Sequence, residues 1–104
     1  MYQDNFVNAI QHRKKVRLTY ISKDNGVVTT KICAPIDFGP KRLAQNQSDR
    51  YHLWDFEGEQ RHHILSLLPE SIVKMEVLPE IFLPEDFVVW PTNWFVKRDW
   101  GEYS

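Results

Sequence analysis

The first residues repeat their hydrophobic positions with the period of a helix. Within residues 4–13, Phe6 and Ile10 lie one helical turn apart among polar neighbours. Asp4 or Asn5 can cap such a helix at its N-terminus. Cations follow at its C-terminal end, where the helix dipole favours positive charge. The pattern therefore predicts a short amphipathic helix.

After this helix the period changes to that of β-strands. Residues 16–21 alternate apolar and polar side chains, and residues 27–34 are rich in Val, Thr and Ile. An Asn-Gly pair between them predicts a tight turn, because glycine readily adopts a positive φ. Pro35 predicts the end of the second strand, since proline lacks the N–H group that a central ladder requires. Residues 36–49 then predict a long connection.

Residues 50–68 form the most informative segment, with two strand-like runs joined by an acidic turn that has Gly58 at its tip. Aromatic residues, histidines and an arginine are interleaved on both arms. The loop length decides the register: a two-residue loop places His52 opposite His63, and a three-residue loop places it opposite Ile64. In either register the hairpin forms part of a sheet wall and offers a binding surface.

The remaining pattern completes one domain. Residues 72–78 predict a further strand, and the stretch between Pro79 and Pro84 predicts an extended segment packed on the sheet rather than a ladder strand. The order of helix, hairpin, long loop, hairpin and strand predicts a mainly β fold, a small five-stranded Sm-like barrel with an N-terminal helix. This single domain spans residues 1–104, of which 88–104 form an aromatic tail.

Composition narrows the function classes. A chain of 104 residues with a net charge of −1 can bury a modest core and has no global field that draws it to nucleic acid or an anionic membrane. The N-terminus lacks the features of a secretion signal, and no apolar run is long enough to span a membrane. The lone Cys33 excludes a disulfide framework. These features predict a cytoplasmic protein without a membrane partner.

The order of several residues resembles the WYL domain family. A helix that ends in basic residues precedes the strands, and an aromatic-aliphatic tripeptide stands where the namesake Trp-Tyr-Leu falls. The order is carried by Tyr20, Pro35, the tripeptide at residues 51–53, Arg61, Phe82 and Phe87. The positions that match the family pattern are Tyr20, Tyr51, Leu53 and Arg61, and Tyr51-His52 replaces its Trp-Tyr pair. The resemblance covers residues 6–87.

This resemblance implies a regulatory, ligand-sensing module without enzymatic activity, of a kind found in bacteria and their phages and often fused to a DNA-binding helix-turn-helix. It implies a pocket around Tyr20, Tyr51, Leu53 and Arg61, in which tyrosine supplies a flat wall and arginine the charge anchor. The expected ligand is a nucleotide or nucleic acid. The second arginine of the family is replaced by leucines at residues 67–68, which predicts a less anionic ligand.

The tail supplies a second function hypothesis. Trp90, Trp94 and Trp100 are too large to be left exposed without consequence. They either cover one side of the barrel or form a surface for a protein partner or a second copy of the chain, since tryptophan is a favoured interface anchor. The alternative to ligand sensing is therefore a protein–protein interaction module that docks through its tail.

Signs of catalysis or metal binding are sparse. The adjacent His62 and His63 point to opposite faces of a strand, and one cross-strand pair gives two ligands where zinc needs three or four. Asp55 and Arg61 are expected to form a surface ion pair across the turn. The basic run at residues 12–17 is more typical of a helix end than of a nucleic-acid footprint. With no catalytic motif present, we expect neither an enzyme nor a cofactor or metal.

Overall fold

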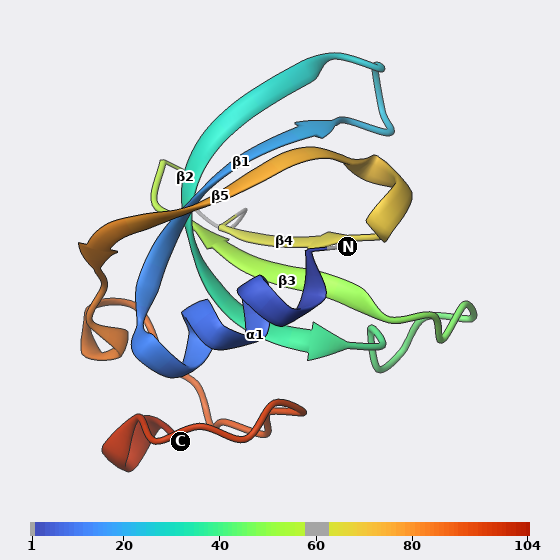
Figure 1. Ribbon diagram of the computed structural model, residues 1–104. Coiled ribbons are helices and arrows are strands. Elements are labelled where there is room, and N and C mark those ends of the chain that lie inside the picture. The colour runs from blue at the N-terminus through green and yellow to red at the C-terminus, as the bar shows by residue number, and fades with distance from the viewer. Residues whose placement is uncertain (1, 58–62) are drawn as a thin grey trace.

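One helix and one antiparallel sheet make up most of the fold (Figure 1). The structure, a computed structural model, describes residues 2–57 and 63–104. Its main elements are α1 (Gln3–His12), β1 (Lys14–Ile21), β2 (Val28–Gly39), β3 (Arg50–Asp55), β4 (Ile64–Leu67) and β5 (Ile72–Ile81). Short 3₁₀ turns are η1 (Pro69–Ser71), η2 (Pro84–Asp86) and η3 (Gly101–Tyr103).

The strands form a single sheet in the order β4-β3-β2-β1-β5. The long β2 pairs with β1 through its first half and with β3 through its second half. Figure 1 shows β2 bending around the molecule, so that the sheet curls around α1. The prediction of a mainly β fold with five strands and an N-terminal helix is confirmed. The described ladders leave β4 and β5 as the two edges, so closure of a barrel between them stays a prediction.

Helix α1 covers the inner face of this sheet with its apolar side. The buried residues of that side are Phe6, Ala9 and Ile10. Tyr2 takes the N-cap position in a helical conformation and makes no side-chain capping bond, so the predicted capping by Asp4 or Asn5 is wrong. The described residues contain no helix with the length and apolarity needed to cross a bilayer.

Strands β2 and β5 both continue through a proline, contrary to the sequence prediction. β2 runs past Pro35 to Gly39, so the predicted strand end and the first part of the predicted loop are wrong. The β1–β2 ladder ends at Cys33, and beyond it β2 is paired with β3 only. A residue without an N–H group is tolerated on the unpaired edge of a strand. A register shift between Pro35 and Asp37 marks a bulge beside the proline. Likewise, Pro79 lies in β5, an edge strand.

The β3–β4 hairpin pairs in a register that neither loop alternative predicted. His52 lies opposite Ser66, so the predicted pairings with His63 and with Ile64 are both wrong. The connection between the two strands is longer than two or three residues, and its predicted tip, Gly58, lies outside the described residues. The strand alternation itself is clear, since buried and half-buried residues alternate along β3.

The tail returns across the molecule after β5. In Figure 1 the last residues, drawn in red, lie beside α1 on the side away from β5. Trp100 is 4% exposed, and its indole N–H donates to the carbonyl oxygen of Ile10 at 2.9 Å. The side-chain amide of Gln11 donates to the carbonyl of Lys97. The tail thereby packs against the C-terminal half of the helix.

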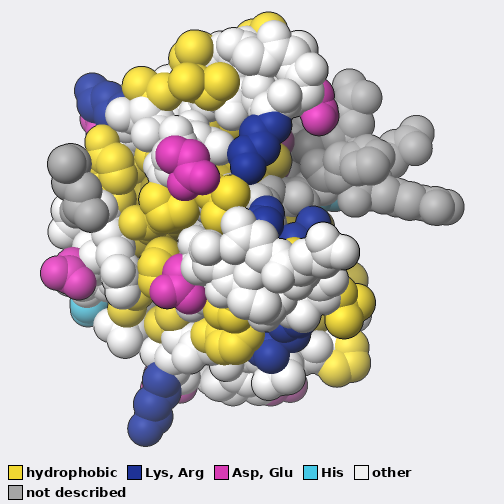
Figure 2. All heavy atoms as spheres, turned by 90° about the vertical axis from the view of Figure 1, so that its right-hand side faces the viewer, with side chains coloured by type: hydrophobic (Ala, Val, Ile, Leu, Met, Phe, Trp, Pro, Cys, Tyr) yellow, Lys and Arg dark blue, Asp and Glu magenta, His cyan; other side chains and the backbone are white. Residues whose placement is uncertain are grey.

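The surface mixes its charges. Figure 2 shows one face on which hydrophobic side chains gather in a band, with lysines, arginines and carboxylates interspersed around it. This distribution agrees with the small net charge of −1. Among the described residues, this face carries no continuous basic track of the kind that follows a nucleic-acid backbone.

Candidate functional site

Two residues of the predicted pocket lie in the hydrophobic core. Tyr51 is 4% exposed and Leu53 is fully buried, both on the inner face of β3. The ring of Tyr51 makes an edge-to-face contact with Phe6 of α1, with centroids 4.9 Å apart. Burial raises the pKa of the Tyr51 phenol. A ligand would reach these side chains only if α1 moved away from the sheet.

The other two residues of that pocket are placed differently. Tyr20 is half-buried at the end of β1, and burial raises the pKa of its phenol. Arg61 lies outside the described residues, and with it the predicted pair with Asp55. Asp55 itself is 3% exposed and binds Lys31 of β2 at 3.1 Å, so its expected surface position is wrong. The hydrogen bond to Asp55 raises the pKa of Lys31.

The outer face of the same hairpin lines a groove of about 390 Å³, which we call the tail groove. His52 and Ser66 contribute to it from β3 and β4. Three aromatic residues of the tail and two cations of the β2–β3 loop also line it, namely Trp90, Trp94, Phe95, Lys41 and Arg42. The groove therefore brings together segments of the chain that lie far apart in the sequence.

A buried carboxylate holds the tail in place along this groove. Asp37 accepts hydrogen bonds from the backbone N–H groups of Phe95, at 3.0 and 3.1 Å, and of Val96, at 3.0 Å. Its Oδ1 also lies 3.3 Å from Nη2 of Arg98, whose side chain is 1% exposed. Hydrogen bonds to a charged group are stronger than neutral ones, so Asp37 fixes the tail to the bulged part of β2.

The cation of this pair lies between two tryptophans. The guanidinium carbon of Arg98 is 4.3 Å from the ring centroids of both Trp94 and Trp100. Arg98 also donates to the carbonyl oxygen of Ile36. Burial lowers the pKa of Arg98 to about 10, and the nearby Asp37 carboxylate opposes that change. Arg98 is therefore cationic at neutral pH and joins the two indoles into one unit.

Arg42 is positioned over the same segment. Its Nη2 donates to the carbonyl oxygen of Asn93 at 2.5 Å, and its guanidinium carbon lies 3.9 Å from the ring centroid of Phe95. Phe95 in turn lies against Gly39, where an added Cβ would be 2.6 Å from Cδ2 of the ring. The missing side chain at Gly39 is what lets Phe95, and Arg42 above it, take these positions.

His52 supports the groove through both ring nitrogens. Nε2 lies 2.9 Å from the carbonyl oxygen of Gly39, which can only accept, so Nε2 carries the proton. Nδ1 then accepts from the hydroxyl of Ser66 at 2.8 Å. Among the described residues, no three His, Cys, Asp or Glu side chains gather closely enough to hold a metal ion.

The three tryptophans of the predicted partner surface have different environments. Trp90 stacks at 6.0 Å on Trp54 of the outer face of β3. Trp94 is half-buried and donates its indole N–H to the carbonyl of Tyr103 at 2.8 Å. Trp100 belongs to the core, as described above, and presents almost no surface to a partner. Only Trp90 and Trp94 line the tail groove.

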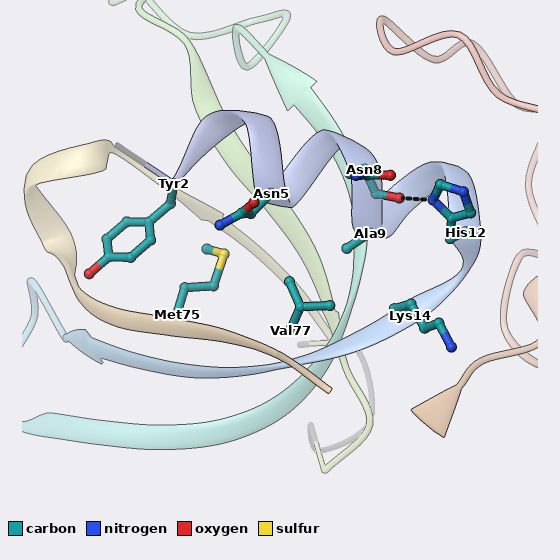
Figure 3. A pocket seen from close by; sticks show the side chains of 8 residues that line it. All are labelled: Tyr2, Asn5, Asn8, Ala9, His12, Lys14, Met75 and Val77. Carbon is teal, nitrogen blue, oxygen red and sulfur yellow. Dashed lines mark hydrogen bonds between the residues drawn. The ribbon is translucent and has the colours of Figure 1, made fainter. Parts of the chain in front are cut away.

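A second hollow, which we call the helix groove, lies between α1 and β5 and has a volume of about 400 Å³ (Figure 3). Polar side chains along one stripe of α1 face Met75 and Val77 of β5 across it. Of the described residues that line it, Lys14 is the only Lys or Arg, and none is a carboxylate. The sequence pattern did not single out this site.

No protein family model, curated protein or solved structure matches the chain. The described residues form a small, mainly β domain with one α-helix, and both the tail groove and the helix groove are hollows of ligand size.

Proposed function

We propose that the protein is a cytoplasmic, non-enzymatic regulatory module of the WYL type, and that its ligand pairs a flat ring with an anionic group. The observation that carries the proposal is the tail groove, in which Lys41 and Arg42 line the same hollow as Trp90 and Trp94. Ammonium and guanidinium groups bind phosphate, and indole rings stack on planar ligands. A nucleotide combines both features.

The charge balance of the groove supports an anionic ligand. Among the described residues that line the groove, Asp37 is the only carboxylate, and it is engaged by Arg98 and by two backbone N–H groups of the tail. Its negative charge is thereby compensated within the protein. Lys41 and Arg42, by contrast, are exposed at the groove. The described lining therefore presents two cations and no uncompensated carboxylate to a ligand.

The size of the groove favours a short ligand. Its volume of about 390 Å³ lies in the range of roughly 300–1,000 Å³ that is usual for small-molecule pockets. The mixed charges of the neighbouring face give a long polyanion little to follow. A mononucleotide therefore suits the groove better than an extended nucleic acid.

The proposal gives the cysteine no nucleophilic role. Cys33 is fully buried, and burial raises the pKa of its thiol to about 12. A reactive cysteine requires a lowered pKa and access to solvent, since the thiolate is the nucleophile.

Titration with uridine 5′-monophosphate, followed by NMR chemical shifts, tests the proposal. We expect shifts in the indole signals of Trp90 and Trp94, and an affinity lowered about tenfold by Arg42→Ala, because a charge-assisted hydrogen bond is lost. Lys23→Ala, which removes an exposed cation of the β1–β2 turn, serves as the control and should leave the affinity unchanged.

A second arm uses an oligouridylate in place of the mononucleotide. If the groove recognises one phosphate and one ring, uridine 5′-monophosphate and the oligouridylate should bind with equal affinity per site. Much tighter binding of the oligomer would identify nucleic acid as the ligand. Shifts confined to the surroundings of Tyr20 and Tyr51 would move the site to the pocket that the sequence predicts, and the tail-groove proposal would be wrong.

A further inference from the structure

The helix groove is bounded at both ends by side chains that reach β5 (Figure 3). At one end the hydroxyl of Tyr2 lies 3.4 Å from the carbonyl oxygen of Val73. At the other end Nζ of Lys14 donates to the carbonyl oxygen of Pro79 at 3.0 Å. An extended chain that passed through the groove would have to displace both contacts. The hollow of about 400 Å³ instead suits one compact small molecule.

The wall on β5 is part of the inner face of the sheet and lacks its cover. Val77 lies opposite Val16 across the β1–β5 ladder, and Met75 lies opposite Leu18. Val16 and Leu18 are fully buried, whereas Val77 is 44% exposed. An apolar ligand surface placed here would complete the core, since each Å² of apolar surface removed from water is stabilising.

The wall on α1 carries two carboxamides that the helix itself does not need. Asn5 and Asn8 are exposed and lie about one helical turn apart. Asparagine is a poor helix former, because its side chain competes for backbone hydrogen bonds. No side-chain capping bond is made at the N-terminus of α1, so Asn5 does not act as a cap. Figure 3 shows Asn5 directed toward Met75 across the groove.

Two polar side chains at the far end, His12 and Lys14, each make one hydrogen bond to a backbone carbonyl oxygen. The Nδ1 atom of His12 lies 2.9 Å from the carbonyl oxygen of Asn8, which can only accept, so Nδ1 carries the proton. The ammonium of Lys14 is bound to Pro79, as described above. Among the described residues, the polar groups of the helix wall that have no hydrogen bond to the protein are the two neutral carboxamides and Nε2 of His12, and an aromatic ring and a thioether lie next to them.

We propose that the helix groove is a second binding site, separate from the tail groove, for an uncharged heteroaromatic ring with adjacent hydrogen-bond donor and acceptor atoms. Adenine has this arrangement at its amino group and N7, and an asparagine carboxamide pairs with both atoms at once. The ring of Tyr2 and the sulfur of Met75 offer contacts to the faces and edge of such a ring. None of the described lining residues is a carboxylate, and Lys14 is bound to Pro79; both features favour a neutral ligand.

Adenosine is the probe that tests this site. We expect its addition to shift the methyl signals of Met75 and Val77 and the side-chain amide signals of Asn5 and Asn8. Purine riboside, which lacks the amino group, should bind at least about tenfold more weakly, because half of the paired contact is lost.

Asn8→Ala is the matching protein variant. It should weaken adenosine binding at least about tenfold, and it should fold, because alanine is the best helix former. Gln3→Ala, an exposed change on the same helix outside the groove, should leave the affinity unchanged. Arg42→Ala, which changes the tail groove, should also leave the affinity for adenosine unchanged. The helix-groove proposal can therefore hold even if the tail groove does not bind a nucleotide.

Three results would overturn the assignment. Equal affinities for adenosine and purine riboside would show that no donor–acceptor pair is recognised. An unchanged affinity in Asn8→Ala would remove the carboxamide from the site. Shifts confined to the tail groove, or none at millimolar adenosine, would show that the helix groove does not bind such a ring.

Discussion

The tail groove and the helix groove are similar in volume and opposite in chemistry. The tail groove joins cations to indole rings, and the segments that form it are held together by distant contacts, such as that between Arg98 and Asp37, which are 61 residues apart. The helix groove joins carboxamides to aliphatic side chains on α1 and β5. One site therefore depends on a docked tail and on charge. The other depends on the body of the fold and is nearly neutral, so the two are separable by mutation.

The largest expected effect comes from Asp37→Asn. The change leaves the Arg98 charge buried without its counterion, and breaking a buried ion pair in this way typically costs about 3–5 kcal/mol. Urea unfolding should show this loss of free energy of unfolding, and binding of uridine 5′-monophosphate should disappear. Adenosine binding should persist below the unfolding transition. Glu85→Gln, at an exposed carboxylate, is the control. If Asp37→Asn abolished the binding of both ligands under conditions where the protein is folded, the two grooves would not be independent sites.

Gly39→Ala should have the next largest effect. The new Cβ would lie 2.6 Å from Cδ2 of Phe95, so the ring must move. Overpacking of this kind costs about 1–3 kcal/mol, and the low end applies because Phe95 is 44% exposed and can shift. The additional change Phe95→Ala removes the clash, so a double-mutant cycle should show clear coupling. If the free-energy changes of Gly39→Ala and Phe95→Ala were instead additive, the loss of stability in Gly39→Ala would not come from the contact with Phe95.

Salt should distinguish the two grooves without any mutation. Raising the ionic strength from about 0.05 M to about 0.5 M screens exposed charges and should weaken binding of uridine 5′-monophosphate several-fold. The affinity for adenosine should change little, since no ion pair forms with a neutral ligand. Isothermal titration calorimetry at both salt concentrations provides the measurement. Equal salt dependence of the two ligands would argue that they share one site.

The smallest effect is expected on the stability of Asn8→Ala. The exchange of an exposed asparagine within α1 for alanine should raise the free energy of unfolding by about 0.5 kcal/mol. The urea midpoint should therefore rise at an unchanged slope. Higher stability together with weaker adenosine binding would indicate that Asn8 contributes to binding although it lowers the stability of α1. A drop in stability would instead assign Asn8 a structural role.

Much of the fold could be read from the sequence because hydrophobic period is a local signal. The helix, the succession of strands along the chain and the shared face of Tyr51 and Leu53 follow from this period. Alternation does not reveal which face of a strand is open, however. Both faces of β3 are covered, the inner one by α1 and the outer one by the tail. Two residues of the predicted pocket, Tyr51 and Leu53, therefore fell on the covered inner face.

The parts that the sequence did not predict depend on distant contacts. Asp37 falls in a stretch expected to be a loop, and nothing near it in the sequence indicates that it binds the backbone of Phe95 or the side chain of Arg98. The register of His52 depends on a loop length that composition does not specify. Lys41 and Arg42 could be recognised as basic, but their place beside the tail tryptophans required the folded chain.

The hydrogen bond between Trp100 and Ile10 joins residues that are 90 positions apart, and this sets an order of events during protein synthesis. Helix α1 leaves the ribosome early, but the indole that caps the Ile10 carbonyl arrives only when residue 100 has been made and released from the exit tunnel. Until then, that carbonyl has only the backbone N–H of Arg13 as a partner, and the inner sheet remains incompletely covered. The nascent chain can thus acquire α1 and its first hairpin well before the tail groove exists, so a site built on the tail is assembled last.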